Sequence, residues 1–313
     1  MLPVTVINTI MYASILILLC VGFSFTHMME GFPNFSHTSY ASIGTMFTYI
    51  LVRLLGQNPY TAWPLAAILN GLVAVAIYLI IVAPMKRGGA NGIHITFAMF
   101  ALNYLIASLM AVFSFWVMKR YPFNTSGFLL RAYDFRFVGY PGILFTAPLI
   151  CVILVFGLHL FLTRVKFGIA IRATAEDPKL SAGLGVNTFL VHLVTWFLVG
   201  AMAGVAGAAL PLWQASGFGG DDELMMNVIA GSVLGGLDNI YGAILGGVFL
   251  AFTQRVLPSL LVNILGIWFA GYQSLTPIVV VVGVLTLEPR GLPGFAARIR
   301  KWLNSRKTRS HSA

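Results

Sequence analysis

Long apolar stretches, separated by short polar segments, set the pattern of this chain. Residues 2–29, 90–118 and 188–220 contain no Lys, Arg, Asp or Glu. Each stretch exceeds the roughly 20 apolar residues that an α-helix needs to cross a bilayer. The runs are continuous, whereas the strands of a membrane β-barrel would show short segments of alternating polarity. The pattern therefore predicts an all-α, polytopic helical membrane protein.

The lengths of the apolar segments predict both full spans and broken ones. Two pieces, around residues 28–35 and 224–237, are too short or too interrupted to cross easily alone, and they predict half-helices or re-entrant segments. Such backbone is tolerated at membrane depth where it is buried in protein or lines a cavity. We expect about eight to ten crossings in a single transmembrane domain over residues 1–313. Full-length spans are predicted at residues 4–23, 39–55, 62–82, 93–117, 143–162, 188–210, 241–256 and 274–287.

Charged residues are sparse, and their positions predict the orientation of the chain. They make up 9% of the sequence, against roughly 25% in soluble domains. The formal net charge of +10 is concentrated in three clusters, which the positive-inside rule places in the cytoplasm. In the basic tail, 295–313, contact with anionic lipid head groups is a simpler explanation than nucleic-acid binding. The clusters contain Lys86 and Arg87; Arg164, Lys166, Arg172 and Lys179; and the basic residues from Arg290 to Arg309.

One basic loop falls on the unexpected side of this scheme. If all three clusters are inside, residues 188–210 run outward, Asp221 and its acidic neighbours lie outside, and residues 224–237 must return inward. The loop 119–142 then lies outside, although it contains Lys119, Arg120, Arg131 and Arg136 and a single acid, Asp134. It matches no pattern that we can place.

The two halves of the chain share a faint similarity. Both stretches begin with polar residues, continue with a tyrosine (Tyr40 or Tyr241) and a glycine, and have an arginine (Arg53 or Arg255) near the end. Their sequences are NFSHTSYASIGTMFTYILVRLL and GLDNIYGAILGGVFLAFTQRVL. Many transporters are built from internal repeats with the substrate site near their interface. The pairing suggests an internal repeat, and chance is the alternative.

Glycines four residues apart recur in the second half. Small residues at this spacing let helix backbones approach closely. In a bilayer this close packing drives helix association, because lipid provides no hydrophobic driving force for it. We interpret them as helix-packing positions in a compact helical core. They are Gly200 and Gly204, Gly231 and Gly235, and Gly242 and Gly246.

A polar segment, RATAEDPKLSAGLGVN (172–187), separates two of the most apolar stretches. Asp177 followed by Pro178 is a helix-start pattern, because a carboxylate caps free backbone N–H groups and proline fits the first helical position. Gly183 and Gly185 offer left-handed positions that would end this helix. The pattern predicts two short helical pieces with a hinge. An ordinary cytoplasmic loop is the alternative, whereas a short helix along the membrane face suits insertion into a partner's groove.

Four stretches resemble, in order, the permeases of high-affinity branched-chain amino acid ABC importers. The polar segment is similar to that family's R-A-x-A-x-D-P-x-x-A-x-x-x-G-[IV]-N. NFSH (34–37) resembles N-F-A-H, GSVLGGLDNIYGAILGG (231–247) resembles A-V-L-G-G-x-G-S-x-x-G-A-x-x-G-G, and LEPRGLPG (287–294) resembles P-x-G-L-x-G. The N-F-x-H and D-P features favour the first, LivH-like, permease subtype. Asp238-Asn239 departs from the family's Gly-Ser and leaves the exact solute open.

The resemblance implies a permease subunit of an ATP-driven importer for branched-chain or related amino acids. It implies ATPase subunits, a second permease chain in a homo- or heterodimer, and an extracytoplasmic solute-binding protein. It further implies a multi-pass protein of the plasma (inner) membrane of a prokaryote, with a cytoplasmic C-terminus.

The ATP-hydrolysing site is expected on another subunit. The chain contains no Gly-Lys pair and therefore no P-loop. ATP would therefore be hydrolysed by the separate ATPase. This chain is expected to be neither an enzyme nor a cofactor binder. Within the ATPase-coupling loop 164–187, the expected coupling residues are Arg172, Ala173, Glu176, Asp177, Pro178, Lys179, Ala182 and Gly185.

Polar residues in or beside the interrupted segments are candidates for the translocation path. Exposed half-helix ends can hold zwitterionic groups through unpaired N–H or C=O groups. His37 and Asp238 have structural alternatives, since each can instead cap or bond a helix; for Asp238 that is the helix beginning near Tyr241. Glu30 is interpreted as interfacial. The candidates are Asn34, Ser36, His37, Asn227, Ser232, Asp238 and Asn239.

Other function classes find less support in the sequence. An ion-coupled secondary carrier needs ionisable residues deep within its spans, and no apolar segment here contains a central Asp or Glu. No metal site is expected, because no two of the six histidines have the spacing of a ligand pair. Cys20 and Cys151 are interpreted as buried packing thiols. A urea or short-amide permease of the same family is the alternative for the solute.

Overall fold

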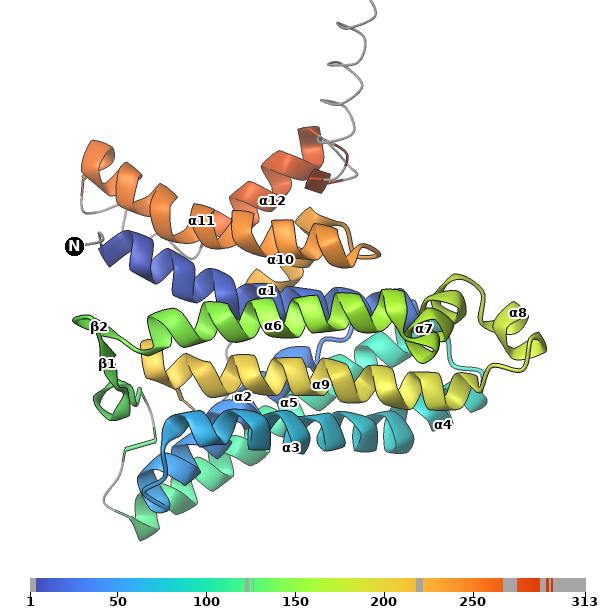
Figure 1. Ribbon diagram of the computed structural model, residues 1–313, viewed down its shortest axis with the longest axis horizontal. Coiled ribbons are helices and arrows are strands. Elements are labelled where there is room, and N and C mark those ends of the chain that lie inside the picture. The colour runs from blue at the N-terminus through green and yellow to red at the C-terminus, as the bar shows by residue number, and fades with distance from the viewer. Residues whose placement is uncertain are drawn as a thin grey trace, which may run out of the picture.

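The protein is a bundle of long helices, which Figure 1 shows from the side. This computed structural model describes residues 4–121, 124–125, 127–217, 222–266, 275–287, 291–292 and 294; the predicted tail, 295–313, and Asp221 lie outside them. The helices are α1 Val4–Glu30, α2 His37–Tyr49, η1 Ile50–Leu54, η2 Pro59–Thr61, α3 Ala62–Ile77, η3 Tyr78–Val82, α4 Ala83–Arg87, α5 Gly92–Arg120, η4 Arg131–Tyr133, α6 Ile143–Arg164, α7 Lys166–Glu176, α8 Pro178–Gly183, α9 Thr188–Trp213, α10 Asp222–Gly235, α11 Ile240–Leu265 and α12 Thr276–Leu287. Strands β1 Arg136–Phe137 and β2 Tyr140–Pro141 form an antiparallel hairpin.

The predicted all-α, multi-pass membrane fold is confirmed. Among the described residues, six helices are long and apolar enough to cross a membrane: Val4–Glu30, Pro59–Arg87, Gly92–Arg120, Ile143–Arg164, Thr188–Trp213 and Ile240–Val262. Two predicted spans, 39–55 and 274–287, correspond to shorter helices. α2 is also more polar than a typical span, and its hydroxyl and imidazole side chains are buried against neighbouring helices. These are His37, Thr38, Ser39, Ser42, Thr45 and Thr48.

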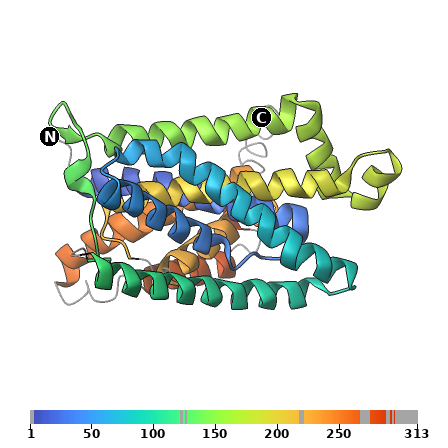
Figure 2. The same cartoon turned by 90° about the horizontal axis from the view of Figure 1, so that it is seen from below.

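Helices α1 and α9 form the centre of the bundle. α9 packs on α1, α2 and α3, and α1 packs in turn on α6, α10 and α11. Figure 1 shows α1, α6 and α9 in the middle, with α10 to α12 on one side and α2, α3 and α5 on the other. In Figure 2, α5 and α6 lie at opposite margins of the molecule. The two central helices contribute more buried apolar residues to the core than any other described helix.

The two ends of the bundle differ in what they present. Helices α4, α7 and α8 lie at one end, called here the α7–α8 end, and the hairpin and the start of α1 lie at the other, called the hairpin end (Figure 1). The polar segment 172–187 lies at the α7–α8 end, and the polar segment 131–142 lies at the hairpin end (Figure 1). A membrane-crossing bundle would present them to the two aqueous sides.

Close backbone contact joins α3 to α9 through two of the predicted glycines. A Cβ atom on Gly200 would overlap the backbone of Asn70, and one on Gly204 would overlap the carbonyl of Ala66. Only a residue without a side chain fits at this separation.

The remaining two glycine pairs face each other between α10 and α11. Gly231 lies against Gly246, and Gly235 lies against Gly242, so that a Cβ atom on Gly246 or Gly235 would meet the opposing carbonyl. The spacing of four residues on both antiparallel helices puts the two contacts one turn apart. The short α10 is thereby held along the start of α11.

A glycine that the sequence did not single out makes the tightest approach to α2. Gly207 of α9 lies against the backbone of Ala41, and the Thr45 hydroxyl donates to its carbonyl at 2.7 Å. We expect Gly207→Ala to lower the free energy of unfolding by about 1–3 kcal/mol, because α2 must move away. Gly157→Ala is the matched control, since Gly157 is helical and has open space around it. Thermal unfolding in detergent measures both, and equal melting temperatures would contradict the prediction.

The predicted half-helix at residues 28–35 is wrong. α1 continues through Met28 to Glu30 without a break, because residues 23–30 contain neither glycine nor proline and the surrounding helices bury this part. Gly31 (φ 72°) ends the helix, and its N–H donates to the His27 carbonyl at 2.8 Å. The other interrupted segment, 224–237, is largely the short α10, as predicted.

Candidate functional site

The segment between α6 and α9 forms two short helices with a hinge at Asp177. The backbone of Asp177 is extended (φ −148°, ψ 98°), and its carboxylate accepts from the N–H groups of Lys179 and Leu180, both at 2.9 Å. Pro178 occupies the first turn of α8. Gly185 is left-handed (φ 85°), whereas Gly183 is still helical. The prediction of a left-handed Gly183 is therefore wrong, because one such position suffices to end the helix.

The exposure pattern of α7 and α8 separates an inner face from an outer one. Ile171, Thr174 and Ser181 are buried. Two large apolar side chains point outward instead, with Leu180 62% and Leu184 77% exposed. Arg172, Ala173, Glu176, Asp177, Pro178, Lys179, Ala182 and Gly185, the expected coupling residues, are all exposed.

Leu180 and Leu184 were not among the expected coupling residues. In Figure 1, α8 lies beyond the ends of the long helices, so burial in lipid alongside the bundle does not account for them. Exposed apolar side chains on a polar, capped segment are typical of a protein–protein contact. Their spacing of four residues was the signal available in the sequence.

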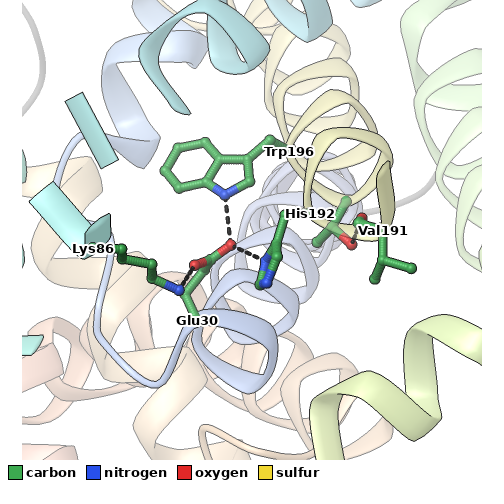
Figure 3. A network of polar contacts seen from close by, with 6 residues as sticks. Glu30, Lys86, Val191, His192 and Trp196 are labelled. Atoms are coloured by element: carbon green, nitrogen blue, oxygen red, sulfur yellow. Dashed lines mark hydrogen bonds and ion pairs between the residues drawn. The ribbon is translucent and has the colours of Figure 1, made fainter. Parts of the chain in front are cut away.

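A buried carboxylate joins three helices at the α7–α8 end (Figure 3). The Glu30 side chain is 0% exposed and pairs with the ammonium of Lys86 from α4. Its Oε1 accepts from His192 Nδ1 and from Trp196 Nε1, both at 2.8 Å and both from α9. The Tyr78 ring stacks on His192 at 5.7 Å between centroids. We call Glu30, Lys86, His192 and Trp196 the Glu30 network.

Glu30, interpreted from the sequence as interfacial, is buried inside the protein at the α7–α8 end. Glu30 ends α1, where the helix dipole disfavours an anion, and it is buried because three donors from neighbouring helices compensate its charge. The sequence contained a signal, since Glu30 is the only acidic residue before Asp134. Its partners are 56 to 166 residues away in the chain, so the sequence could not identify them.

The turn between α1 and α2 holds one group of the predicted path residues. Asn34, Ser36 and His37 are all at least 99% buried. Asn34 Oδ1 accepts from the backbone N–H and the hydroxyl of Ser36, at 3.1 and 2.8 Å. The His37 ring packs against Gly22 and beside the backbone of Leu19. This group is a tightly packed polar corner.

A second group lies where α1, α10 and α11 meet. Asn227 donates to the Tyr12 hydroxyl at 2.7 Å and accepts from Gln254 at 2.5 Å. The Ser232 hydroxyl donates to the Cys20 carbonyl at 3.3 Å. Both predicted residues are buried. These bonds satisfy polar groups between helices, as buried polar groups require.

The third group, Asp238 and Asn239, forms the turn from α10 to α11. Asn239 caps α11 by accepting from the N–H groups of Tyr241 and Gly242 at 3.0 and 3.1 Å. Asp238 therefore does not cap this helix, because the neighbouring amide occupies that position. Its carboxylate is 80% exposed and lies 2.9 Å from His27 Nδ1.

One pocket of about 180 Å³ brings a coupling residue and two path residues together. It lies between α6, α7 and the α10–α11 turn, and Arg172, Asp238 and Asn239 line it beside apolar side chains of α6. The first two groups lie elsewhere. A single shared path for the seven candidates stays a prediction.

Within the described part of the chain, no three His, Cys, Asp or Glu side chains gather into a group that could hold a metal ion. Cys20 and Cys151 are buried free thiols.

Comparison with known sequences identifies the family. The family described as "Branched-chain amino acid transport system / permease component" matches residues 5–285. This chain belongs to that permease family. The permease is 30% identical over 287 residues to the probable branched-chain amino acid transport permease protein LivH of Methanocaldococcus jannaschii, covering 92% of this chain and 91% of the relative.

Bacterial relatives agree at lower identity. The high-affinity branched-chain amino acid transport system permease protein LivH of Escherichia coli is 25% identical, over 92% of this permease and 94% of the relative. The corresponding protein BraD of Pseudomonas aeruginosa is also 25% identical, over 79% and 83%. No solved structure matches the permease. The resemblance to LivH-like permeases is therefore confirmed.

Proposed function

We propose that this permease is the transmembrane subunit of an ATP-driven importer and that α7 and α8 transmit movement from a cytoplasmic ATPase. The observation that supports this most is the outward face of α8. Leu180 on the capped helix and Leu184 at its C-cap are exposed beyond the bundle, and exposed apolar side chains on such a segment suit insertion into a partner's groove. The ATPase is the partner that the family relationship leads us to expect.

The contacts of α7 supply a route for that movement. α7 packs on α6, α9 and α1, and the Glu30 network joins α9 to α1 and α4. A displacement of α8 would therefore act through α7 on α1 and α9, which the hydrogen bonds of Glu30 with His192 and Trp196 tie together. Packed elements of this kind transmit a shift as a rigid rearrangement.

The orientation follows from the same assignment. We place the α7–α8 end in the cytoplasm, where Lys86, Arg87 and Arg164 satisfy the positive-inside rule. The hairpin end then faces outward, toward an extracytoplasmic solute-binding protein. A second permease chain, a prokaryotic plasma membrane and a cytoplasmic C-terminal tail complete the proposal.

The proposed solute is a branched-chain or related amino acid. Support comes from the names of the relatives, all of which are branched-chain amino acid permeases. The solute class is measured by adding unlabelled amino acids, urea or short amides and testing whether they reduce the uptake of labelled leucine. Competition by urea alone would assign the solute to the amide class.

Crosslinking tests the docking of α8. Cysteines at Lys179 and Ala182, both exposed on α8, are expected to crosslink to the ATPase in assembled complexes. Buried Cys20 and Cys151 should contribute little background, and a cysteine at Lys119, exposed at the end of α5, is the negative control.

Two results would contradict the proposal. Crosslinking from cysteines in the tail but not from α8 would reject the docking role. Proton-dependent uptake with ATP hydrolysis blocked would instead indicate an ion-coupled carrier.

A further inference from the structure

The loop 119–142, which resembles no family pattern, is tied firmly to the bundle at the hairpin end. Phe128 and Ser216 exchange two backbone hydrogen bonds at 2.9 Å, and the Leu130 N–H donates to the Pro211 carbonyl at 2.7 Å. Asp134 accepts from the Tyr60 hydroxyl at 2.5 Å and from the Ile143 N–H at 3.1 Å. The loop is thereby held by α9, η2 and α6.

This fixed loop directs aromatic, aliphatic and basic side chains outward. Two of them, Phe137 (56% exposed) and Val138 (77% exposed), form the tip of the hairpin. We call the exposed set the hairpin surface. Its residues are Arg131, Tyr133, Phe135, Arg136, Phe137 and Val138.

Two arginines of the hairpin surface line one hollow. The hollow has a volume of about 420 Å³, and Arg131, Asp134 and Arg136 are its charged residues. Asp134 is engaged by the two hydrogen bonds that hold the loop. Among the described residues, neither arginine makes an ion pair with it or with any other acid. The hollow therefore presents net positive charge.

Arg131 is also positioned before any partner arrives. The Arg131 guanidinium lies 4.8 Å from the centroid of the Trp213 ring, which restricts its movement. Arginine and tryptophan are both enriched among the residues that dominate the binding energy of protein interfaces, and a guanidinium binds a carboxylate with two parallel hydrogen bonds.

We propose that the hairpin surface docks a protein face that presents carboxylates, namely that of the extracytoplasmic solute-binding protein. This inference rests on the proposed function, which puts the hairpin end outside. On that side the positive-inside rule disfavours basic residues near spans, so two arginines in one hollow need another reason. A rigid, concave surface fits a folded partner better than it fits fluid lipid head groups.

Charge reversal tests the surface. The permease–ATPase complex is assembled in nanodiscs of zwitterionic lipid, with the cognate solute-binding protein as the probe. The Arg131→Glu/Arg136→Glu variant is expected to bind this protein at least about tenfold more weakly, with a shallower dependence on ionic strength. Lys119→Glu/Arg120→Glu, with the same charge change at the exposed end of α5, should bind within about twofold of the unaltered complex.

Basal ATPase activity separates the outcomes. It should be equal in all three complexes, and the melting temperature of each shows that the variants fold. Binding restored by an acidic-to-basic change on the solute-binding protein would confirm the contact. Unchanged binding of the solute-binding protein to the Arg131→Glu/Arg136→Glu variant would overturn the proposal. An effect of this variant on binding that occurs only in nanodiscs of anionic lipid would also overturn it, because the hairpin surface would then contact lipid. An unaltered complex without ATPase activity would contradict the proposed function itself.

Discussion

Glu30→Ala is expected to lower the free energy of unfolding by about 3 kcal/mol, the largest single-residue effect on stability that we predict. The change removes the acceptor for the Lys86 ammonium, the His192 ring and the Trp196 indole at once. An unpaired buried donor costs its desolvation without compensation. Lys86 is 32% exposed and can turn partly toward water, which holds the loss below that of a fully enclosed pair.

Two variants separate charge from hydrogen bonding in the Glu30 network. Glu30→Gln keeps an amide oxygen for His192 and Trp196, so it should destabilise less than Glu30→Ala. The double variant Glu30→Gln/Lys86→Met leaves no lone charge and should be more stable than Glu30→Gln alone. Denaturant unfolding in detergent micelles measures all three. Equal stability of Glu30→Ala and the unaltered permease would show that the Glu30 network does not contribute to the free energy of unfolding.

Leu180→Asp/Leu184→Asp is expected to weaken ATPase association roughly 100-fold and to reduce uptake to background. Both side chains are exposed in the isolated permease, so the fold should tolerate the change. In the proposed interface, however, each new carboxylate would be buried without a partner, at a high cost. Co-purification with the ATPase and transport in proteoliposomes measure the two effects.

Val138→Asp is the matched control for the α8 variant. Val138 is as exposed as Leu184, at 77%, but lies in the hairpin at the opposite end of the bundle. ATPase association should not change in this variant. If the α8 variant co-purified with the ATPase normally while Val138→Asp did not, the assignment of the two ends would be reversed.

The sequence was informative wherever a feature depends on neighbours in the chain. The capping of α8 by Asp177, the left-handed Gly185 and the hinge between two helices follow from local backbone geometry. Spans were predictable from hydropathy, because lipid requires about 20 apolar residues of any helix that crosses it. The family motifs are local patterns too, and they identified the permease family without the structure.

The sequence was misleading where long-range packing decides the outcome. A break was predicted near Met28, but no local residue stops α1 before Gly31, and the helices around it bury the extension. Asp238 and Asn239 are both capable caps, and only the turn geometry selects Asn239.

The sequence by itself determined the helical membrane fold, the helix boundaries around α8 and the family, since each depends on composition or on residues a few positions apart. Only the tertiary structure decided that Glu30 is buried, that its donors come from α4 and α9, and that the path candidates occupy three places. These facts depend on which helices meet, and a pattern along one chain does not encode the depth of a side chain among helices distant in sequence.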